Sequence, residues 1–370
     1  MAVDLTELES LLDGLNGLNE SDKFKMSEAL FLEAFKTQNI KNNHPALGEV
    51  RHGQKMPILG MEGGYDSFAF TDGCALPSCD ISADWSEFQW CIGEIGCEVT
   101  ICFKDLAPKF LAFFNVWRKM NEGDIQNAFI QFVSELFQDR HLKAEFRVAY
   151  LGDTDATVTV GEETDEPDPL FNGCDGFIKQ MDAIATADES LKVNITENEA
   201  ATLAEQTITD GDDLYAYLTE IYNKSAVKPW FNPSQMVWRM NRSLANVLVG
   251  WLNSKSDLNG INCACIDPSK VVGSRGFTID NLAVFGIRVE AYDFEEAMKT
   301  SAYYWDGTAF TKYKNIIILA REDAMILGYE TTDSLNHFNI GYDVRKREIF
   351  MQGSSMFGAG VPVPYFVIGI

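Results

Sequence analysis

Cysteine is the residue type in this sequence whose number and spacing first suggest chemistry. Five of the eight cysteines fall in one glycine-broken segment, at Cys74, Cys79, Cys91, Cys97 and Cys102. Structural zinc sites favour cysteine pairs separated by two residues, whereas the intervening residues here number four, eleven, five and four. Cys263 and Cys265 form a further pair with no second pair beside them. The spacing favours buried thiols, and leaves metal binding and disulfides within or between subunits as alternatives.

The other reactive residue types form no catalytic motif. The four histidines make no His-x-x-x-His pair and lie beside no cysteine pair: His44, His52, His141 and His337. The chain lacks a Gly-x-Ser-x-Gly elbow, a phosphate-binding loop and a Gly-x-Gly-x-x-Gly fingerprint. Carboxylates are too numerous for one pair to be singled out. We therefore expect no catalytic, cofactor-binding or metal-binding residue, and a protein that is not an enzyme.

Composition and charge narrow the class of protein. The chain has 370 residues, of which 46% are apolar and 23% charged, as is typical of a folded protein. Its net charge of −25 argues against a dedicated nucleic-acid binder, which would carry a basic stripe. Residues 151–213 hold 17 Asp or Glu against only Lys179 and Lys192. A solvated acidic face is the favoured interpretation, and a calcium site at 210–213 is the alternative, although the EF-hand spacing is missing.

The sequence contains no membrane-spanning or secretory segment. The longest apolar runs, at 110–114 and 316–320, fall far short of the roughly 20 residues that a spanning helix needs. The first residues carry neither the basic region nor the apolar region of a signal peptide. We expect a protein that is made and kept in a cytosol, with its thiols reduced.

The first 104 residues are expected to form short helices followed by a long extended excursion. Short helices are expected at 4–15 and 27–36. Residues 51–104 are broken by glycines and have strand-like composition, which predicts a long two-stranded excursion. Such a hairpin is marginal alone in water, so we expect it to need a partner surface.

The strongest helical pattern lies at 105–137, where one helix is expected to begin at 105–108 and a second at 123–124. Apolar residues repeat there at i, i+3 and i+4, as on a helix that packs one face against the body. The expected packing residues are Ile125, Phe129, Phe132, Val133 and Leu136. Residues 146–151 then predict a strand, because their composition is aromatic and β-branched.

An α/β-like block is expected after the acidic stretch. Residues 315–321 form a continuous apolar run that suits a buried central strand, and Gly286 interrupts the strand expected around it. The patterns predict, in order, a helix at 214–222, a short strand at 230–231, a helix that begins at 232–233 and runs to 251, and strands at 282–291, 315–321 and within 349–370.

Four segments stand out when they are taken in order: 170–178 (LFNGCDGFI), 230–233 (WFNP) with the helix expected after them, 281–289 (NLAVFGIRV) and 314–320 (KNIIILA). Together they resemble the major capsid proteins of tailed double-stranded DNA phages, the Hong Kong 97 fold. The first two segments are similar to the entry into that family's axial domain, the third resembles the strand that precedes the return of the chain, and the fourth resembles the later central strand. The likeness covers most of residues 50–370.

The resemblance implies an α+β, Hong Kong 97-like fold in five parts. The helix that carries Phe129 and Phe132 would be the spine helix of a peripheral domain. The implied parts are an N-terminal arm at 1–50, an extended E-loop-like excursion at 51–104, the peripheral domain at 105–170, an axial domain at 171–324, and return strands shared by both domains at 325–370.

The resemblance also implies a function. The chain would self-assemble through pentamers and hexamers into an icosahedral phage head shell around double-stranded DNA. Portal, scaffold or decoration proteins would be its partners, and an acidic shell would contact the packaged DNA weakly and without sequence specificity. It would be a virion component assembled in the host bacterial cytoplasm. Arg345, Lys346 and Arg347 are candidates for salt bridges between subunits, with contact to DNA as the alternative.

Three other functions stay open on the sequence. An encapsulin-like nanocompartment shell would have the same fold around an enzyme cargo. Another head or tail structural protein of a phage would also self-associate. An enzyme with an unrecognised site is the alternative from a different class of protein.

Overall fold

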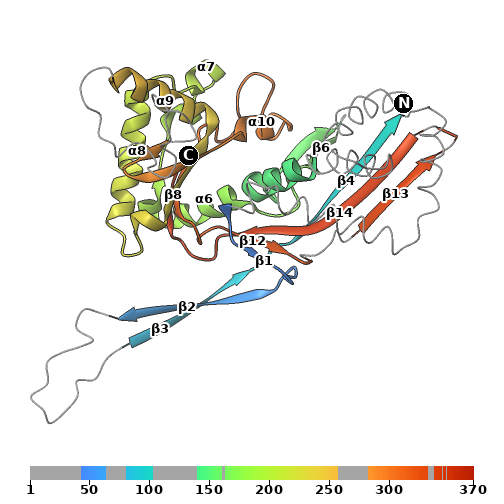
Figure 1. The fold of residues 1–370 in the computed structure, drawn as a ribbon, viewed down its shortest axis with the longest axis horizontal. Helices are drawn as coiled ribbons and strands as arrows, with labels where there is room; N and C mark the ends of the chain where they lie inside the picture. The colour runs from blue at the N-terminus through green and yellow to red at the C-terminus, as the bar shows by residue number, and fades with distance from the viewer. Residues whose placement is uncertain are drawn as a thin grey trace, which may run out of the picture.

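The computed structural model of the chain describes residues 43–63, 81–102, 140–160, 163–256, 282–331, 337–343, 345–346 and 348–370. These residues form an α+β fold with one six-stranded sheet, one five-stranded sheet and two separate two-stranded ribbons. Figure 1 shows a compact, helix-covered part, from which a long sheet and a hairpin extend in different directions.

The six-stranded sheet forms the centre of the compact part. Helices α6 (Phe177–Ala187), α8 (Gly211–Ala226) and α9 (Arg242–Ser256) pack around it. Strand β8 (Met236–Asn241), at the centre of this sheet, is buried along its whole length, as expected for a strand covered on both faces. The strand order is β7 (Lys192–Val193), β15 (Phe366–Gly369), β11 (Ile317–Arg321), β8 (Met236–Asn241), β10 (Ile287–Tyr292) and β9 (Ala283–Val284).

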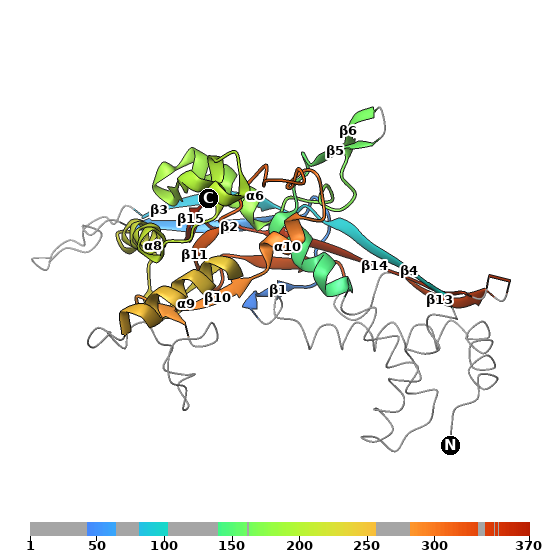
Figure 2. The same ribbon diagram turned by 90° about the horizontal axis from the view of Figure 1, so that it is seen from above.

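The five-stranded sheet is built along one long strand, β14 (Glu348–Gly360). β4 (Gly93–Cys102) pairs with β14 from Glu348 to Phe357. On the other edge, β13 (His337–Asp343) and then β12 (Ile326–Tyr329) pair with it in succession. β1 (Ala46–Leu47) lies parallel to β12. In both views the β4, β13 and β14 strands reach well beyond the compact part (Figures 1 and 2).

Two antiparallel ribbons leave the body. β2 (Lys55–Gly63) pairs with β3 (Ile81–Gln89) from Lys55 opposite Gln89 to Gly63 opposite Ile81. β5 (Thr157–Val160) pairs with β6 (Glu163–Pro167) and projects from the body in Figure 2. Shorter elements complete the described chain: a helix at 140–151, η1 (Glu189–Leu191), η2 (Thr196–Glu199), α7 (Leu203–Gln206), η3 (Pro233–Gln235) and α10 (Phe294–Met298).

Several sequence-based expectations are confirmed. The helix expected at 214–222 lies inside α8, and the buried run at 315–321 contains β11. The two-stranded excursion expected at 51–104 is confirmed only in part: 55–89 contain the β2–β3 hairpin, whereas 93–102 form β4 of the five-stranded sheet. The strand expected at 282–291 is divided into β9 and β10 by a turn in which Phe285 and Gly286 both have positive φ, 52° and 76°. The C-terminal stretch forms β14 and β15.

Three expectations are wrong. Residues 146–151 form the end of a helix, and their aromatic and β-branched side chains serve packing because 148–151 are all buried. Residues 236–241 form strand β8, and only 242–256 form a helix. A strand that is buried on both faces shows no alternation, so its apolar residues matched helical spacing by chance. Residues 230–231 form no strand and lie in the irregular connection between α8 and η3. The helices expected at 4–15, 27–36 and 105–137 lie outside the described residues.

Candidate functional site

The base of the β2–β3 hairpin is fixed to the five-stranded sheet by a small apolar cluster, which we call the hairpin joint. Val50, Trp90 and Ile92 are buried at its centre, and Phe88 packs edge-to-face against Trp90 with 5.2 Å between ring centroids. The remaining members are Ile326 of β12 and Met356 of β14. The joint is separate from the main core, so the hairpin is attached through its own contacts.

Backbone hydrogen bonds hold both strands of the hairpin at the joint. The Gly53 amide donates to the Trp90 carbonyl (2.8 Å), and the Trp90 amide donates to the Gln54 carbonyl (2.9 Å). The Val50 amide donates to the Tyr329 carbonyl of β12 (3.0 Å). Gly53 has a φ of 77°, a conformation that favours glycine. The joint therefore fixes the backbone as well as the side chains.

A second feature is the slot that holds Asn43 and His44 against the core, which we call the arm slot. His44 is buried, and its Nε2 lies 2.8 Å from the Tyr150 hydroxyl. The backbone carbonyl of Asn43 accepts a hydrogen bond from the Arg239 guanidinium (3.2 Å). The side-chain amide of Asn43 donates to the Tyr292 hydroxyl (3.0 Å). The arm slot thus joins the end of the N-terminal segment to the 140–151 helix, β8 and β10.

The arm slot places charge deep in the protein. Arg239 is fully buried on β8, and its Nε lies 3.2 Å from a carboxylate oxygen of Glu290. Burial, reinforced by the charge of Arg239, holds the pKa of His44 well below its usual value, against an opposing hydrogen bond with the Met325 backbone. His44 is therefore neutral at neutral pH, and its protonation would place a second positive charge beside Arg239.

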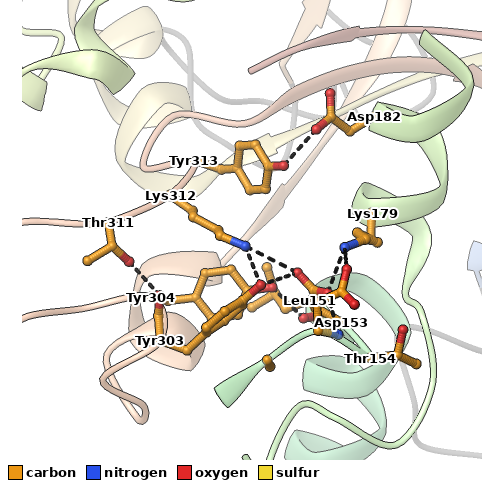
Figure 3. A network of polar contacts seen from close by, with 12 residues as sticks. Leu151, Asp153, Thr154, Lys179, Asp182, Tyr303, Tyr304, Thr311, Lys312 and Tyr313 are labelled. Carbon is orange, nitrogen blue, oxygen red and sulfur yellow. Dashed lines mark hydrogen bonds and ion pairs between the residues drawn. The ribbon is translucent and has the colours of Figure 1, made fainter. Parts of the chain in front are cut away.

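The third feature is a polar network between the end of the 140–151 helix, α6 and the 299–316 loop (Figure 3). Asp153 is buried at its centre and accepts hydrogen bonds from Lys179 Nζ (2.8 Å) and the Tyr303 hydroxyl (2.6 Å). Lys312 lies 3.4 Å from the same carboxylate and also contacts the Tyr303 hydroxyl. The Tyr304 hydroxyl donates to the Leu151 carbonyl (2.7 Å). The network ties three separate segments into one unit.

The electrostatics of the network favour its charged form. Burial alone would raise the pKa of Asp153, but hydrogen bonds from Lys179 and Tyr303 outweigh it and hold the pKa below its usual value. For Lys179, the hydrogen bonds and charges of Asp153 and Asp155 likewise outweigh desolvation and raise the pKa. The charges of the network are paired with one another, which is the pattern of a structural cross-link.

The residues expected at the spine helix and the basic run are only partly described. Ile125, Phe129, Phe132, Val133 and Leu136 lie outside the described residues, as does Arg347. Arg345 and Lys346 are exposed in the turn between β13 and β14, where their backbone amides donate to the Asp343 side chain. Their part in contacts between subunits stays a prediction.

Cys91 and Cys174 are free thiols. Cys174 is buried, and burial, with the nearby Cys91, raises its pKa to about 12. For this residue the expectation of a buried thiol is confirmed. Cys74, Cys79, Cys263 and Cys265 lie outside the described residues, and only the backbone of Cys97 and Cys102 is described.

Two further kinds of site are absent from the described part of the chain. No cluster of three or more His, Cys, Asp or Glu side chains there could hold a metal ion. Among the same residues, no helix combines the length and apolar character needed to cross a bilayer.

The sequence did not point to the central residues of the arm slot and the polar network. Arg239 carried one usable signal, a single charge inside an apolar run (MVWRM), which in a buried strand must be paired. Asp153 was hidden among the many carboxylates of 151–213. His44 follows two asparagines in a segment without periodicity, so nothing in the sequence indicated its burial.

Comparisons with known proteins show which fold this chain shares. No family model and no curated protein matches the chain. Among solved structures, the chain is similar to a chain of the satellite phage P4 procapsid including size determination (Sid) protein. The identity is 11%, the match covers 92% of this chain and 98% of that chain, and the TM-score is 0.51. This likeness shows a shared fold, so the resemblance to phage capsid proteins is confirmed at the level of an α+β capsid fold.

Two further solved structures are more distant. The capsid of cyanophage P-SCSP1u contains a chain that is 16% identical, with 90% of this chain and 88% of that chain covered and a TM-score of 0.46. A chain of Gordonia phage Cozz is 13% identical, with 90% and 86% covered and a TM-score of 0.43.

Proposed function

We propose that this chain is the building block of a phage head shell, in which copies associate as pentamers and hexamers around double-stranded DNA. The observation that carries the proposal is the fold shared with a chain of the P4 procapsid across 92% of this sequence. The chain acts in this proposal as a structural protein, a component of the virion that is assembled in the host cytoplasm.

The two extended parts support self-assembly on physical grounds. Within the described residues, β2 and β3 pair only with each other, and a two-stranded ribbon is marginal on its own in water. A neighbouring copy can supply the missing surface, and an interface of this kind between identical subunits can close on itself by symmetry. The β4, β13 and β14 strands extend a second surface in another direction (Figure 1).

The proposal assigns the parts of the Hong Kong 97 fold to this chain. The β2–β3 hairpin is the E-loop, the compact part around the six-stranded sheet belongs to the axial domain at 171–324, and residues 105–170 belong to the peripheral domain. Residues 1–50 are the N-terminal arm, whose end occupies the arm slot, and 325–370 are the return strands. Supporting this division, β12 and β14 lie in the long sheet whereas β15 returns to the six-stranded sheet.

Charge supports the assignment of contacts in the shell. A chain with a net charge of −25 repels phosphate groups on balance, because attraction to phosphate needs Lys and Arg, so packaged DNA would contact the shell only weakly. We assign Arg345 and Lys346, exposed at the tip of the long sheet, to salt bridges with acidic residues of a neighbouring subunit. Portal, scaffold or decoration proteins complete the set of partners.

Negative-stain electron microscopy of the purified protein, with size-exclusion chromatography alongside, tests the proposal. Closed shells, or rings of five and six subunits, are expected. A single species of about 41 kDa at every protein concentration, in the presence of a crowding agent as well, would contradict self-assembly. A shell that forms only around a protein cargo would instead support the nanocompartment alternative.

A further inference from the structure

Three glycines form a flat patch beneath the hairpin joint. Gly328 of β12 and Gly358 of β14 are direct partners in the sheet register, and Gly360 lies two residues beyond Gly358. Residues i and i+2 of a strand, and residues paired across two strands, share one face of a sheet. The patch is therefore a continuous area without side chains on one face of the five-stranded sheet.

The space above the patch is filled by the joint. A Cβ atom added to Gly328 would lie 2.7 Å from the Trp90 ring, and one added to Gly360 would lie 2.8 Å from the Phe88 ring. A Cβ atom on Gly358 would lie 2.3 Å from the Cys91 carbonyl oxygen. Each distance is shorter than real contacts allow, and the last involves backbone, which cannot rotate away. The aromatic rings and the backbone of residues 88–92 rest directly on the sheet.

Because the rings and the backbone lie so close to the sheet, the joint determines the direction in which the hairpin extends. Each strand of the hairpin has nine residues, or about 30 Å at about 3.3 Å per residue. A rotation of about 10° at the joint would move the far end by about 5 Å, more than the rise of one residue. A neighbour that pairs with or packs on the hairpin would then meet it out of register.

We propose that the glycine patch and Trp90 form a fixed joint, which sets the direction of the β2–β3 hairpin before a neighbouring copy binds it. The inference rests on the proposed shell function for its second step only. Its first step, that the joint is rigid in the single subunit, holds without assembly. The joint lowers the entropy lost on association, because the hairpin is already ordered in its bound direction.

The test compares glycine-to-alanine variants that differ in the space available for the added methyl group. Gly358→Ala and Gly328→Ala place a methyl group inside the joint. Gly96→Ala is the matched control: Gly96 lies in β4 of the same sheet, it is exposed, and its added Cβ would make an ordinary contact of 3.6 Å with Ser354. Trp90→Phe is a second probe, which loosens the joint by removing part of the ring and adds no clash.

Hydrogen exchange of the unassembled subunit gives the first measurement. Exchange of the amides in 50–54 and 88–92 is expected to accelerate by on the order of 10-fold or more in Gly358→Ala, Gly328→Ala and Trp90→Phe. Exchange in β8 and β11 should stay unchanged, which shows that the compact part is folded. Gly96→Ala should match the wild type throughout. Wild-type protection of 50–54 and 88–92 in all three joint variants would overturn the inference.

Electron microscopy of the same variants gives the second measurement. The wild type and Gly96→Ala are expected to give particles of one diameter, and the joint variants are expected to give irregular assemblies or none. Uniform wild-type particles from variants with accelerated exchange would show that the joint does not direct assembly, and would overturn the second step. A wild type that never assembles would overturn the proposed function, while the exchange result would still decide whether the joint is rigid.

Discussion

The compact part and the β2–β3 hairpin bury their apolar residues by different means. In the compact part, β8 and β11 lie at the centre of a six-stranded sheet, and helices packed around that sheet complete one large core. The hairpin has one small cluster at its base, the hairpin joint, and no third strand among the described residues. The first arrangement buries its apolar residues within one subunit, whereas the second is the surface that, in the proposed function, a neighbouring copy covers.

This difference separates stability from assembly. Substitutions in the compact part should lower the free energy of unfolding of the subunit. Substitutions in the extended parts should leave that free energy nearly unchanged and alter association instead.

Trp238→Ala should be the most damaging change to the compact part. Trp238 is fully buried on β8, and its Nε1 donates to the Val284 carbonyl at 3.2 Å. Loss of the side chain should lower the free energy of unfolding by about 3–5 kcal/mol. Val227→Ala, at a side chain that is 80% exposed, should change it by less than about 0.5 kcal/mol. Denaturant unfolding of the unassembled subunit measures both, and equal effects would contradict the separation.

Asp153→Asn should have the next largest effect, because it removes the central charge of the polar network. Lys179 and Lys312 would lose their buried partner, and we expect a loss of about 2–3 kcal/mol in the free energy of unfolding. Asp155→Asn is the matched control, since Asp155 binds the same Lys179 but its side chain is 77% exposed. It should cost less than about 1 kcal/mol. The prediction fails if the two variants unfold at the same denaturant concentration.

The stability of the arm slot should depend on pH through His44. Its pKa is lowered in the folded protein, so the unfolded chain binds a proton more readily, and stability is full above about pH 6.5 and falls as the pH decreases. The wild type should lose about 1 kcal/mol more than His44→Gln between pH 6.5 and 5.5. Thermal unfolding at a series of pH values measures the difference. Parallel pH profiles for the two proteins would show that His44 is not the titrating group.

Arg345→Ala and Lys346→Ala should have the smallest effect on the subunit. Both side chains are exposed in a turn, so the free energy of unfolding should change by less than about 0.5 kcal/mol. Assembly should become less sensitive to salt, because salt screens the proposed ion pairs between subunits. Arg242→Ala, an exposed cation on the compact part, is the control and should not alter the salt dependence. Light scattering at a series of salt concentrations measures the extent of assembly.

The sequence predicted some elements of both regions and missed others. Glycines marked the segment that contains the β2–β3 hairpin, and in the compact part the pattern around Gly286 divided β9 from β10 as expected. Strand β8 was read as helix because a strand covered on both faces has no alternation. The 140–151 helix was read partly as a strand because its aromatic residues reflect tertiary packing rather than local preference. The arm slot and the polar network depend on residues that meet only after folding, such as His44 with Tyr150 and Asp153 with Tyr303.

Removal of the hairpin tests the separation of folding from assembly most directly. Residues 57–87 would be replaced by Asn-Gly, which suits a tight turn between Met56 and Phe88 and leaves the hairpin joint in place. Analytical ultracentrifugation and thermal unfolding would follow the variant beside the wild type. The account predicts a subunit that unfolds at the wild-type temperature and sediments as a monomer. Closed shells from this variant, or a subunit that no longer folds, would contradict it.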